Sequence, residues 1–304
     1  MMEETVFAVA AAGLLGLMVG SFLNVVIYRL PVMMNREYDR AAKEILAKPV
    51  EQVLAWLPAD KAASGRALLG VAAEPPPRFN LLLPRSRCGS CGAGIKAWQN
   101  IPVLSWLLLR GRCGSCRAPV SVRYPLVELL TGVLFGVVAW RYGADAVTAW
   151  GCVLTAFVLA LTFIDADTQL LPDDLTLPLV WLGLLFNLHT GFVPLSQAVW
   201  GAVAGYMSLW TLYQTFKLLT GKEGMGHGDF KLLAAVGAWV GAAVLPVVVL
   251  GASLVGIAAA LVKRVGKGQP MAFGPCLAVA GWLVFLFHNQ VGTLIAWWLA
   301  KSGF

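Results

Sequence analysis

The sequence Gly224-Met-Gly-His-Gly-Asp-Phe-Lys231 forms a glycine-rich turn with an acid near its end, directly before a long apolar run. A second acidic segment, Asp165-Ala-Asp-Thr-Gln-Leu-Leu-Pro-Asp173, follows another charge-free run, and its first acid lies 64 residues (229 minus 165) before Asp229. An ionisable residue at membrane depth is a functional candidate by default. The sequence therefore favours an aspartyl protease whose catalytic pair is Asp165 and Asp229.

A catalytic pair of this kind needs two carboxyls that share one proton. One carboxyl activates a water as general base and the other protonates the leaving amine, provided that crowding separates their pKa values. Gly226 and Gly228 would let the backbone approach a substrate closely, because glycine lacks a Cβ atom. The alternative is a polar loop between two membrane helices, whose acids only meet solvent.

The composition indicates a polytopic membrane protein. Of 304 residues, 59% are hydrophobic and 13% are charged, and the mean hydropathy is +0.74. A soluble globule of this length would be far less apolar. The formal net charge of +7 reflects cations that we expect on the cytoplasmic side of the membrane, so it predicts no nucleic-acid partner.

The apolar runs, which are free of charges except for Glu128, predict an all-α polytopic membrane protein with about eight transmembrane helices. The runs expected to span are residues 5–28, 125–140, 146–164, 175–216, 232–262 and 271–287. The fourth run is long enough for two helices that turn near His189 and Pro194, and the fifth for two short helices that meet near Pro246. Residues 291–299 are too few for a further crossing.

The distribution of Lys and Arg predicts the orientation in the membrane. Lys263, Arg264 and Lys267 should lie on the same side as Lys231, which requires an even number of passes between them. Both termini are then outside, and the cytoplasmic side holds every Lys and Arg except Arg141 and Lys301. Asp165 and Asp229 face the cytoplasm together, as a shared water requires.

Three regions follow from these patterns. Residues 1–30 form the first transmembrane helix, 31–123 a cytoplasmic domain inserted between the first two membrane helices, and 124–304 a membrane-embedded peptidase domain. The segment from Arg29 to Arg123 carries 15 of the 23 Lys and Arg. Within it, residues 35–70 have a helical period that ends before Pro75-Pro-Pro77, and their role stays open, as does that of the intramembrane acid Glu128.

Four of the six cysteines form two Cys-x-x-Cys pairs, at Cys88 with Cys91 and at Cys113 with Cys116. Two such turns, separated by 21 residues, supply the four thiolates of a closed, structural zinc site. Two disulfides are the alternative, but a cytoplasmic compartment is reducing and favours zinc. Cys152 and Cys276 lie singly in apolar runs and are expected to act as small core residues.

The remaining patterns either indicate helix packing or exclude other kinds of active site. Gly16-x-x-x-Gly20 and Gly201-x-x-x-Gly205 are typical of closely packed membrane helices. No βαβ unit surrounds the glycine-rich turn, so it is not a phosphate cradle. Neither a His-Glu-x-x-His metalloprotease motif nor a Gly-x-Ser-x-Gly elbow is present.

Together these motifs resemble those of the bacterial type 4 prepilin leader peptidases. The matching segments are Gly20-Ser-Phe-Leu-Asn-Val-Val-Ile-Tyr-Arg-Leu-Pro31, both Cys-x-x-Cys pairs, Arg123-Tyr-Pro-Leu-Val-Glu128, the Asp165–Asp173 and Gly224–Lys231 segments, and Phe273-Gly-Pro275. The Gly-x-Gly-Asp element also occurs in presenilin-type proteases, but the cysteine pairs and the Leu-Pro-Asp element are similar to the prepilin branch.

The resemblance implies a bifunctional enzyme of the bacterial inner membrane. It removes the short basic leader of type IV prepilins and type II secretion pseudopilins after a glycine, on the cytoplasmic side, and then methylates the new N-terminal residue with S-adenosylmethionine. The family's catalytic pair corresponds to Asp165 and Asp229. The supporting residues implied are Asp167, Asp173, Gly226, Gly228 and Lys231, and no fingerprint indicates where the methyl donor binds.

Two alternatives stay open on the sequence. One is a membrane assembly factor with a zinc ribbon and no enzymatic activity, in which the acids are loop residues. The other is a Gly-x-Gly-Asp protease of another substrate class, such as signal peptides or transmembrane stubs. Neither the individual pilin substrates nor the oligomeric state follows from the motifs.

Overall fold

The computed structural model describes residues 2–58, 61, 79–222, 224–263 and 272–302. Pro75-Pro-Pro77, the cations Arg264 and Lys267, and the expected helix start at Met271 lie outside these residues. The described part of the chain contains helices and two isolated β-bridges, and it contains no β-strand. This confirms the all-α prediction.

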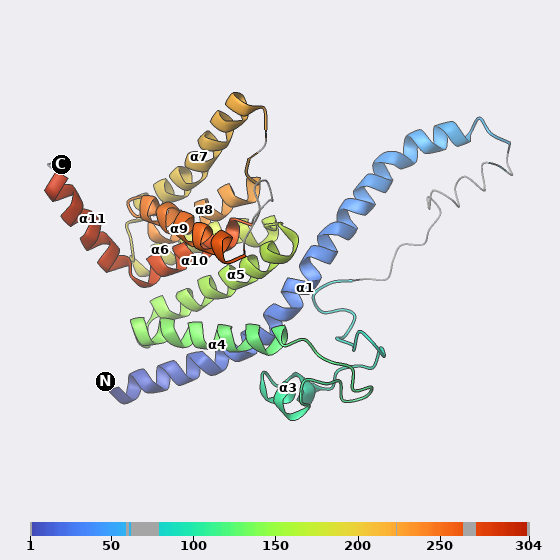
Figure 1. Ribbon diagram of the computed structural model, residues 1–304, viewed down its shortest axis with the longest axis horizontal. Coiled ribbons are helices and arrows are strands. Elements are labelled where there is room, and N and C mark those ends of the chain that lie inside the picture. The colour runs from blue at the N-terminus through green and yellow to red at the C-terminus, as the bar shows by residue number, and fades with distance from the viewer. Residues whose placement is uncertain (1, 59–60, 62–78, 223, 264–271, 303–304) are drawn as a thin grey trace. The chain divides into compact units, whose positions relative to one another are not determined.

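The helices follow one another in the order shown in Figure 1. Their bounds are α1 Met2–Leu54, η1 Ala97–Asn100, α3 Leu104–Leu108, α4 Arg123–Tyr142, α5 Ala146–Thr168, α6 Asp173–Thr190, α7 Leu195–Thr220, α8 His227–Val240, α9 Leu245–Lys263, α10 Gly274–Leu286 and α11 His288–Ser302. The two turns expected inside long apolar runs occur where predicted, between α6 and α7 and, close to Pro246, between α8 and α9.

Among the described residues, four helices are long and apolar enough to cross a membrane. They are Glu3–Leu46 within α1, Arg123–Tyr142, Ala146–Thr168 and Leu245–Val262. The pair α10 and α11, bent by 88°, gives a fifth if it is counted as one broken span. The structure thus supports a polytopic membrane protein, while the count of eight spans stays a prediction.

Two helices differ from the expected bounds. α1 continues past residue 30 through Pro31 and Pro49 to Leu54, because the residues after Asn35 are strong helix formers and a proline can bend a helix without ending it. α11 forms beyond His288, where we expected the chain only to leave the membrane. None of its residues is buried.

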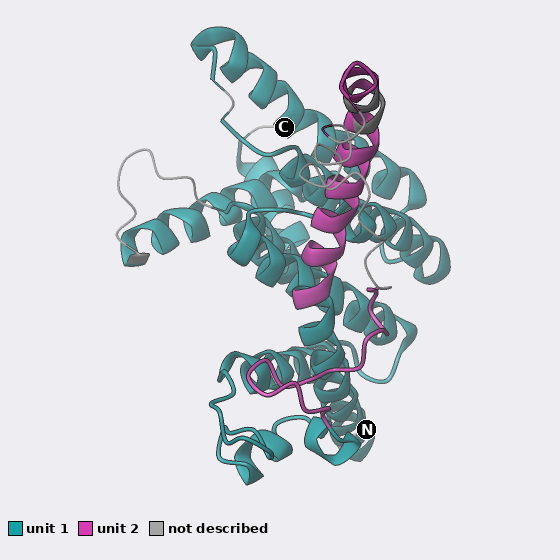
Figure 2. Ribbon diagram, turned by 90° about the vertical axis from the view of Figure 1, so that its right-hand side faces the viewer, with its two compact units in different colours: residues 1–27, 96–304 teal, residues 28–95 magenta. Residues whose placement is uncertain are grey.

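The chain divides into two compact units, residues 1–27 with 96–304, and residues 28–95 (Figure 2). In the smaller unit, the buried Arg29 guanidinium donates to the carbonyls of Asn80 (2.8 Å) and Pro84 (2.6 Å) and lies over the Phe79 ring. These bonds fix the segment that precedes the first cysteine pair.

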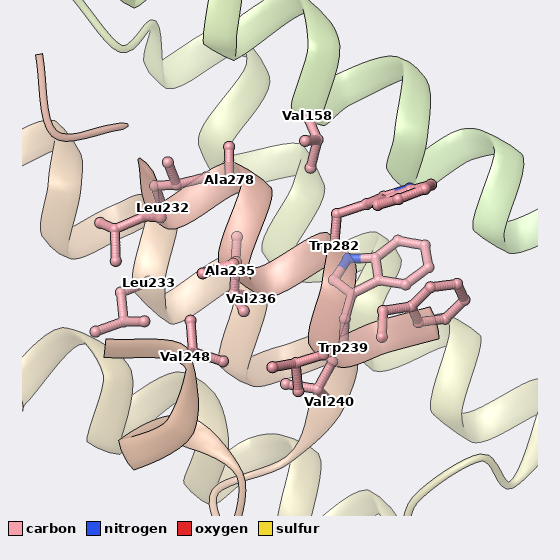
Figure 3. Packing of buried hydrophobic residues seen from close by; sticks show 14 of the residues in the cluster. Val158, Leu232, Leu233, Ala235, Val236, Trp239, Val240, Val248, Ala278 and Trp282 are labelled. Carbon is pink, nitrogen blue, oxygen red and sulfur yellow. The ribbon is translucent and has the colours of Figure 1, made fainter. Parts of the chain in front are cut away.

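α8 forms the centre of the larger unit and packs against α6, α7 and α10 (Figure 1). All its residues from Leu232 to Val240 are buried. Figure 3 shows Trp239 and Trp282 beside these residues, and each indole has a partner: Trp239 donates to Leu179 O (2.9 Å) and Trp282 to Thr155 Oγ1 (2.8 Å). A core this apolar holds α8, and therefore the turn before it, in one position.

Glycines allow the closest helix contacts in this unit. A Cβ atom at Gly205 would lie 2.5 Å from Leu233 O, and one at Gly201 would collide with Gly237 O. At the α1–α4 contact, an added Cβ at Gly16 or Gly20 would lie 2.7 Å from α4 backbone atoms. The prediction that both small-residue motifs serve close packing is confirmed.

Candidate active site

Asp165 and Asp229 occupy the ends of two helices. Asp165 lies in the last turn of α5, and Asp229 lies in the first turn of α8, ahead of the apolar run that begins at Leu232. Asp165 is 4% exposed and Asp229 is 8% exposed. Carboxyls are rarely buried to this extent unless they are paired or functional.

Backbone segments crowd around the pair. The Gly274 N–H, at the start of α10, donates to the Asp165 carboxyl, and the Gly226 N–H donates to the Asp229 carboxyl. A Cβ atom at Gly274 would collide with Asp165 Oδ2. Asp165 Oδ2 is itself buried and has no hydrogen-bond partner among the described residues, so it keeps unused capacity to accept a hydrogen bond, for example from a water.

The charges of the two acids interact. Burial, together with the nearby charge of Asp165, raises the pKa of Asp229 to about 7, while the Gly226 N–H opposes this increase. A carboxyl with such a pKa keeps its proton well above the pH at which an exposed aspartate ionises. The pair can therefore hold one proton at neutral pH, as acid–base catalysis by two carboxyls requires.

The two supporting acids lie outside the buried pair, and each forms an ion pair with a basic side chain. Lys231 Nζ lies 2.6 Å from Asp173 Oδ1, which ties the start of α8 to the start of α6. Arg123 NH2 lies 2.5 Å from Asp167 Oδ2, which ties the start of α4 to the end of α5. Sequence reasoning named Asp167, Asp173 and Lys231 but not their pairing, and it missed Arg123 and Gly274 as site residues, although both lie in motifs quoted for the resemblance.

The predicted site glycines have unequal roles. A Cβ atom at Gly228 would lie 2.6 Å from Leu171 Cβ, so that position requires glycine. At Gly226 the nearest atom would be Asp229 Oδ2 at 3.8 Å, an ordinary contact distance. The close contact at Gly228 is with the Leu171 side chain, and the approach of this backbone to a substrate stays a prediction.

Glu128 anchors a loop instead of joining the aspartate pair. Its Oε2 atom accepts from the Val103 N–H at 2.8 Å and its carboxyl also interacts with the Ser21 side chain. Val103 has a φ of 60°, which a β-branched residue rarely adopts, so this bond holds a strained residue in place. The buried acid thus links α1, α4 and the loop before α3.

The four cysteines of the two pairs come together, with all four sulfur atoms within 4.8 Å of one another. The two turns have the same backbone pattern: the Cys88 N–H donates to Ala93 O and the Cys113 N–H to Ala118 O, each at 2.8 Å. Tetrahedral zinc with bonds of about 2.3 Å needs sulfurs about 3.8 Å apart, so this cluster fits the ion. None of the six cysteines, all of them described, forms a disulfide, and Cys152 and Cys276 are buried as expected.

Comparisons with known proteins agree with these motifs. A family profile described as the bacterial peptidase A24 N-terminal domain matches residues 14–142, and one described as the type IV leader peptidase family matches residues 152–261. The chain is 56% identical to the prepilin leader peptidase/N-methyltransferase of Neisseria gonorrhoeae, over 96% of this chain and 95% of that protein. It is 49% identical to the protein of the same name from Stutzerimonas stutzeri, over 93% and 92% of the two chains. No solved structure matches the chain.

Proposed function

The chain belongs to the type IV leader peptidase family, and we propose that Asp165 and Asp229 are the carboxyls with which it cuts prepilin leaders. The enzyme is a prepilin leader peptidase and N-methyltransferase. The observation that carries the site assignment is a buried acid pair, one oxygen of which has no partner among the described residues. We place cleavage after a glycine at the end of a short basic leader.

The pair performs hydrolysis with one proton and one water. The ionised carboxyl takes a proton from the water as the water oxygen bonds to the scissile carbonyl carbon. The protonated carboxyl gives its proton to the amide nitrogen as the C–N bond breaks. The leader leaves with a new terminal carboxyl, the pilin keeps a free amine, and the pair again holds one proton.

The substrate class agrees with the position of the site. A prepilin presents a basic leader that stays in the cytoplasm and an apolar helix that lies in the bilayer. Eight spans in the inner membrane, with both termini outside, would put Asp165 and Asp229 at the cytoplasmic surface where these two parts meet. Pseudopilins of type II secretion have the same two parts and belong to the same substrate class.

Zinc has a structural role in this proposal. Cys88, Cys91, Cys113 and Cys116 would hold the ion, and a four-sulfur site has no open position for substrate. The ion would join the two Cys-x-x-Cys turns of the cytoplasmic region 31–123. Metal analysis of protein prepared without chelator should give one zinc per chain.

Methyl transfer uses other groups than the aspartate pair. S-adenosylmethionine supplies a methyl group to an amine that must be uncharged and aligned with the donor, and a pair of acids sharing a proton provides neither condition. We place the donor site on the cytoplasmic region that carries the cysteine cluster, because it offers most of the polar surface.

Co-expression with a prepilin tests the function. Mass spectrometry of the pilin N-terminus should find a chain shortened to the residue after the leader glycine and heavier by one methyl group. An unprocessed prepilin would favour the assembly-factor alternative, and cleavage elsewhere in the chain would favour a protease of another class.

A further inference from the structure

Leu171 contacts the backbone beside both aspartates. Besides its contact with Gly228, which precedes Asp229, its Cδ1 atom would lie 3.1 Å from a Cβ atom added at Gly274. Gly274 is the residue whose N–H binds Asp165 and whose added Cβ would also meet Asp165 Oδ2. One leucine side chain therefore contacts both the segment that carries Asp229 and the α10 residue whose N–H binds Asp165.

The link that carries Leu171 is fixed at both ends. It connects α5 and α6, and the Gln169 N–H donates to Asp165 O at 2.9 Å where α5 ends. At the other end Asp173 is bound by Lys231. Leu171 is only partly buried, so it lies at the boundary between the core and the approach to the acids. A short link held in this way gives the side chain little freedom to withdraw from a substrate.

A substrate must place its scissile carbonyl next to these acids. The carbonyl carbon belongs to the last residue of the leader, and that residue's Cβ atom is only two bonds from the carbonyl carbon. Asp165 Oδ2 is buried and lacks a hydrogen-bond partner among the described residues, so it is the oxygen with unused capacity to bind the water. Any side chain on the last leader residue therefore approaches the space beside Asp165 that Leu171 occupies.

We propose that Leu171 restricts the last leader residue to glycine, by filling the volume beside Asp165 and Gly228 that a substrate Cβ atom would need. The inference rests on the proposed peptidase function and adds the residue that sets its specificity. Steric discrimination of about one methyl group changes kcat/KM by about 10- to 200-fold. Removing most of the leucine side chain should therefore raise kcat/KM for a substrate with alanine at this position by a factor in that range.

The test uses the full-length enzyme and two prepilins that differ only in the last leader residue, glycine or alanine. For each variant, the quantity compared is kcat/KM for the alanine substrate divided by kcat/KM for the glycine substrate. Leu171→Ala should raise this ratio at least about tenfold over the unmodified enzyme. Leu170→Ala is the matched control, because the neighbouring leucine is 39% exposed, and it should leave the ratio unchanged.

The result that overturns the proposal is an unchanged ratio in a Leu171→Ala enzyme that still cuts the glycine substrate. Leu171→Val is a milder second variant, and it should raise the ratio by a smaller factor. Loss of glycine cleavage in both variants without any gain for alanine would make Leu171 a packing residue and would also reject the proposal. Failure of the unmodified enzyme to cut the glycine substrate would instead contradict the peptidase function itself.

Discussion

Asp165 and Asp167 lie two residues apart on α5, yet their environments are opposite. Asp165 is buried and has no cation partner among the described residues, whereas the Asp167 side chain is 40% exposed and pairs with Arg123. The same contrast separates Asp229, which is buried, from Asp173, which is 55% exposed and binds Lys231. The four acids thus form a buried pair and two surface ion pairs.

The contrast shows that membership of one motif does not give acids one role. Burial beside a second carboxyl keeps one proton on the pair. The buried pair can therefore both accept and donate a proton near neutral pH. The surface pairs instead connect helix ends, so they position the buried pair.

The largest expected effect comes from neutralising the buried acids. Asp165→Asn and Asp229→Asn should each lower leader cleavage at least about 10³-fold, because proton transfer contributes about 10²–10⁴-fold and neither carboxyl can perform both transfers. Purified enzyme and a prepilin, analysed by gel shift or mass spectrometry, provide the measurement. Cleavage within tenfold of normal in either variant would mean that the buried pair is not the catalytic pair.

Methyl transfer supplies the control for the same variants. Asp165→Asn enzyme, given labelled S-adenosylmethionine and a mature unmethylated pilin, should still label the pilin N-terminus. Such labelling would show that the variant is folded and that the two reactions use different groups. Absence of label in a folded, zinc-loaded variant would mean that they share a site.

An intermediate effect is expected for the Asp173–Lys231 pair. Asp173→Asn should reduce kcat/KM about 3- to 5-fold, because the upper part of the range for a partly exposed ion pair, about 0.2–1 kcal/mol, applies where its loss also relaxes the start of α8. Exchanging the charges, with Asp173→Lys and Lys231→Asp together, should restore part of the activity that either reversal alone removes. No recovery in the double variant would argue against a positioning role.

A smaller effect is expected for the Asp167–Arg123 pair. Asp167→Asn should reduce cleavage about twofold, since both side chains are well exposed and the middle of the range for surface pairs is about 0.5 kcal/mol. Raising the salt concentration should lower the cleavage rate of the unmodified enzyme to a value close to that of this variant. A loss as large as that of Asp165→Asn would erase the distinction between the two classes of acid.

The smallest effect concerns the other buried oxygen without a partner among the described residues, Thr176 Oγ1 on α6. Thr176→Val should raise the free energy of unfolding by about 1 kcal/mol, because it removes an unsatisfied hydroxyl at nearly constant shape. Leader cleavage should not change. A thermal melt with a parallel cleavage assay makes the comparison, and loss of cleavage would add Thr176 to the site.

The sequence predicted the parts of the fold that depend on local patterns. Apolar runs predicted the helix order from α4 to α10, the Gly201 and Gly205 spacing predicted a tight α7–α8 contact, and the cysteine spacing predicted the four-sulfur cluster. These patterns depend on residues close together in the chain or on motifs with a fixed geometry.

The parts that could not be predicted depend on the register between distant helices. Nothing near Lys231 indicates that its partner is Asp173, and nothing near Leu171 indicates that it packs on Gly228 and Gly274. The bond from the Val103 N–H to Glu128 likewise depends on a loop returning to α4. Such contacts follow from tertiary packing, which composition and periodicity do not encode.

The pH dependence of leader cleavage tests the central claim, that the buried pair works with one shared proton. Because the pKa of Asp229 is raised to about 7, the pair keeps its proton below that pH and loses it above, so kcat/KM should fall about tenfold per pH unit on the alkaline side. Asp173→Asn should leave the midpoint of this decline unchanged. A profile with its decline near pH 7 supports the shared proton, and a rate that stays level up to pH 9 would contradict it.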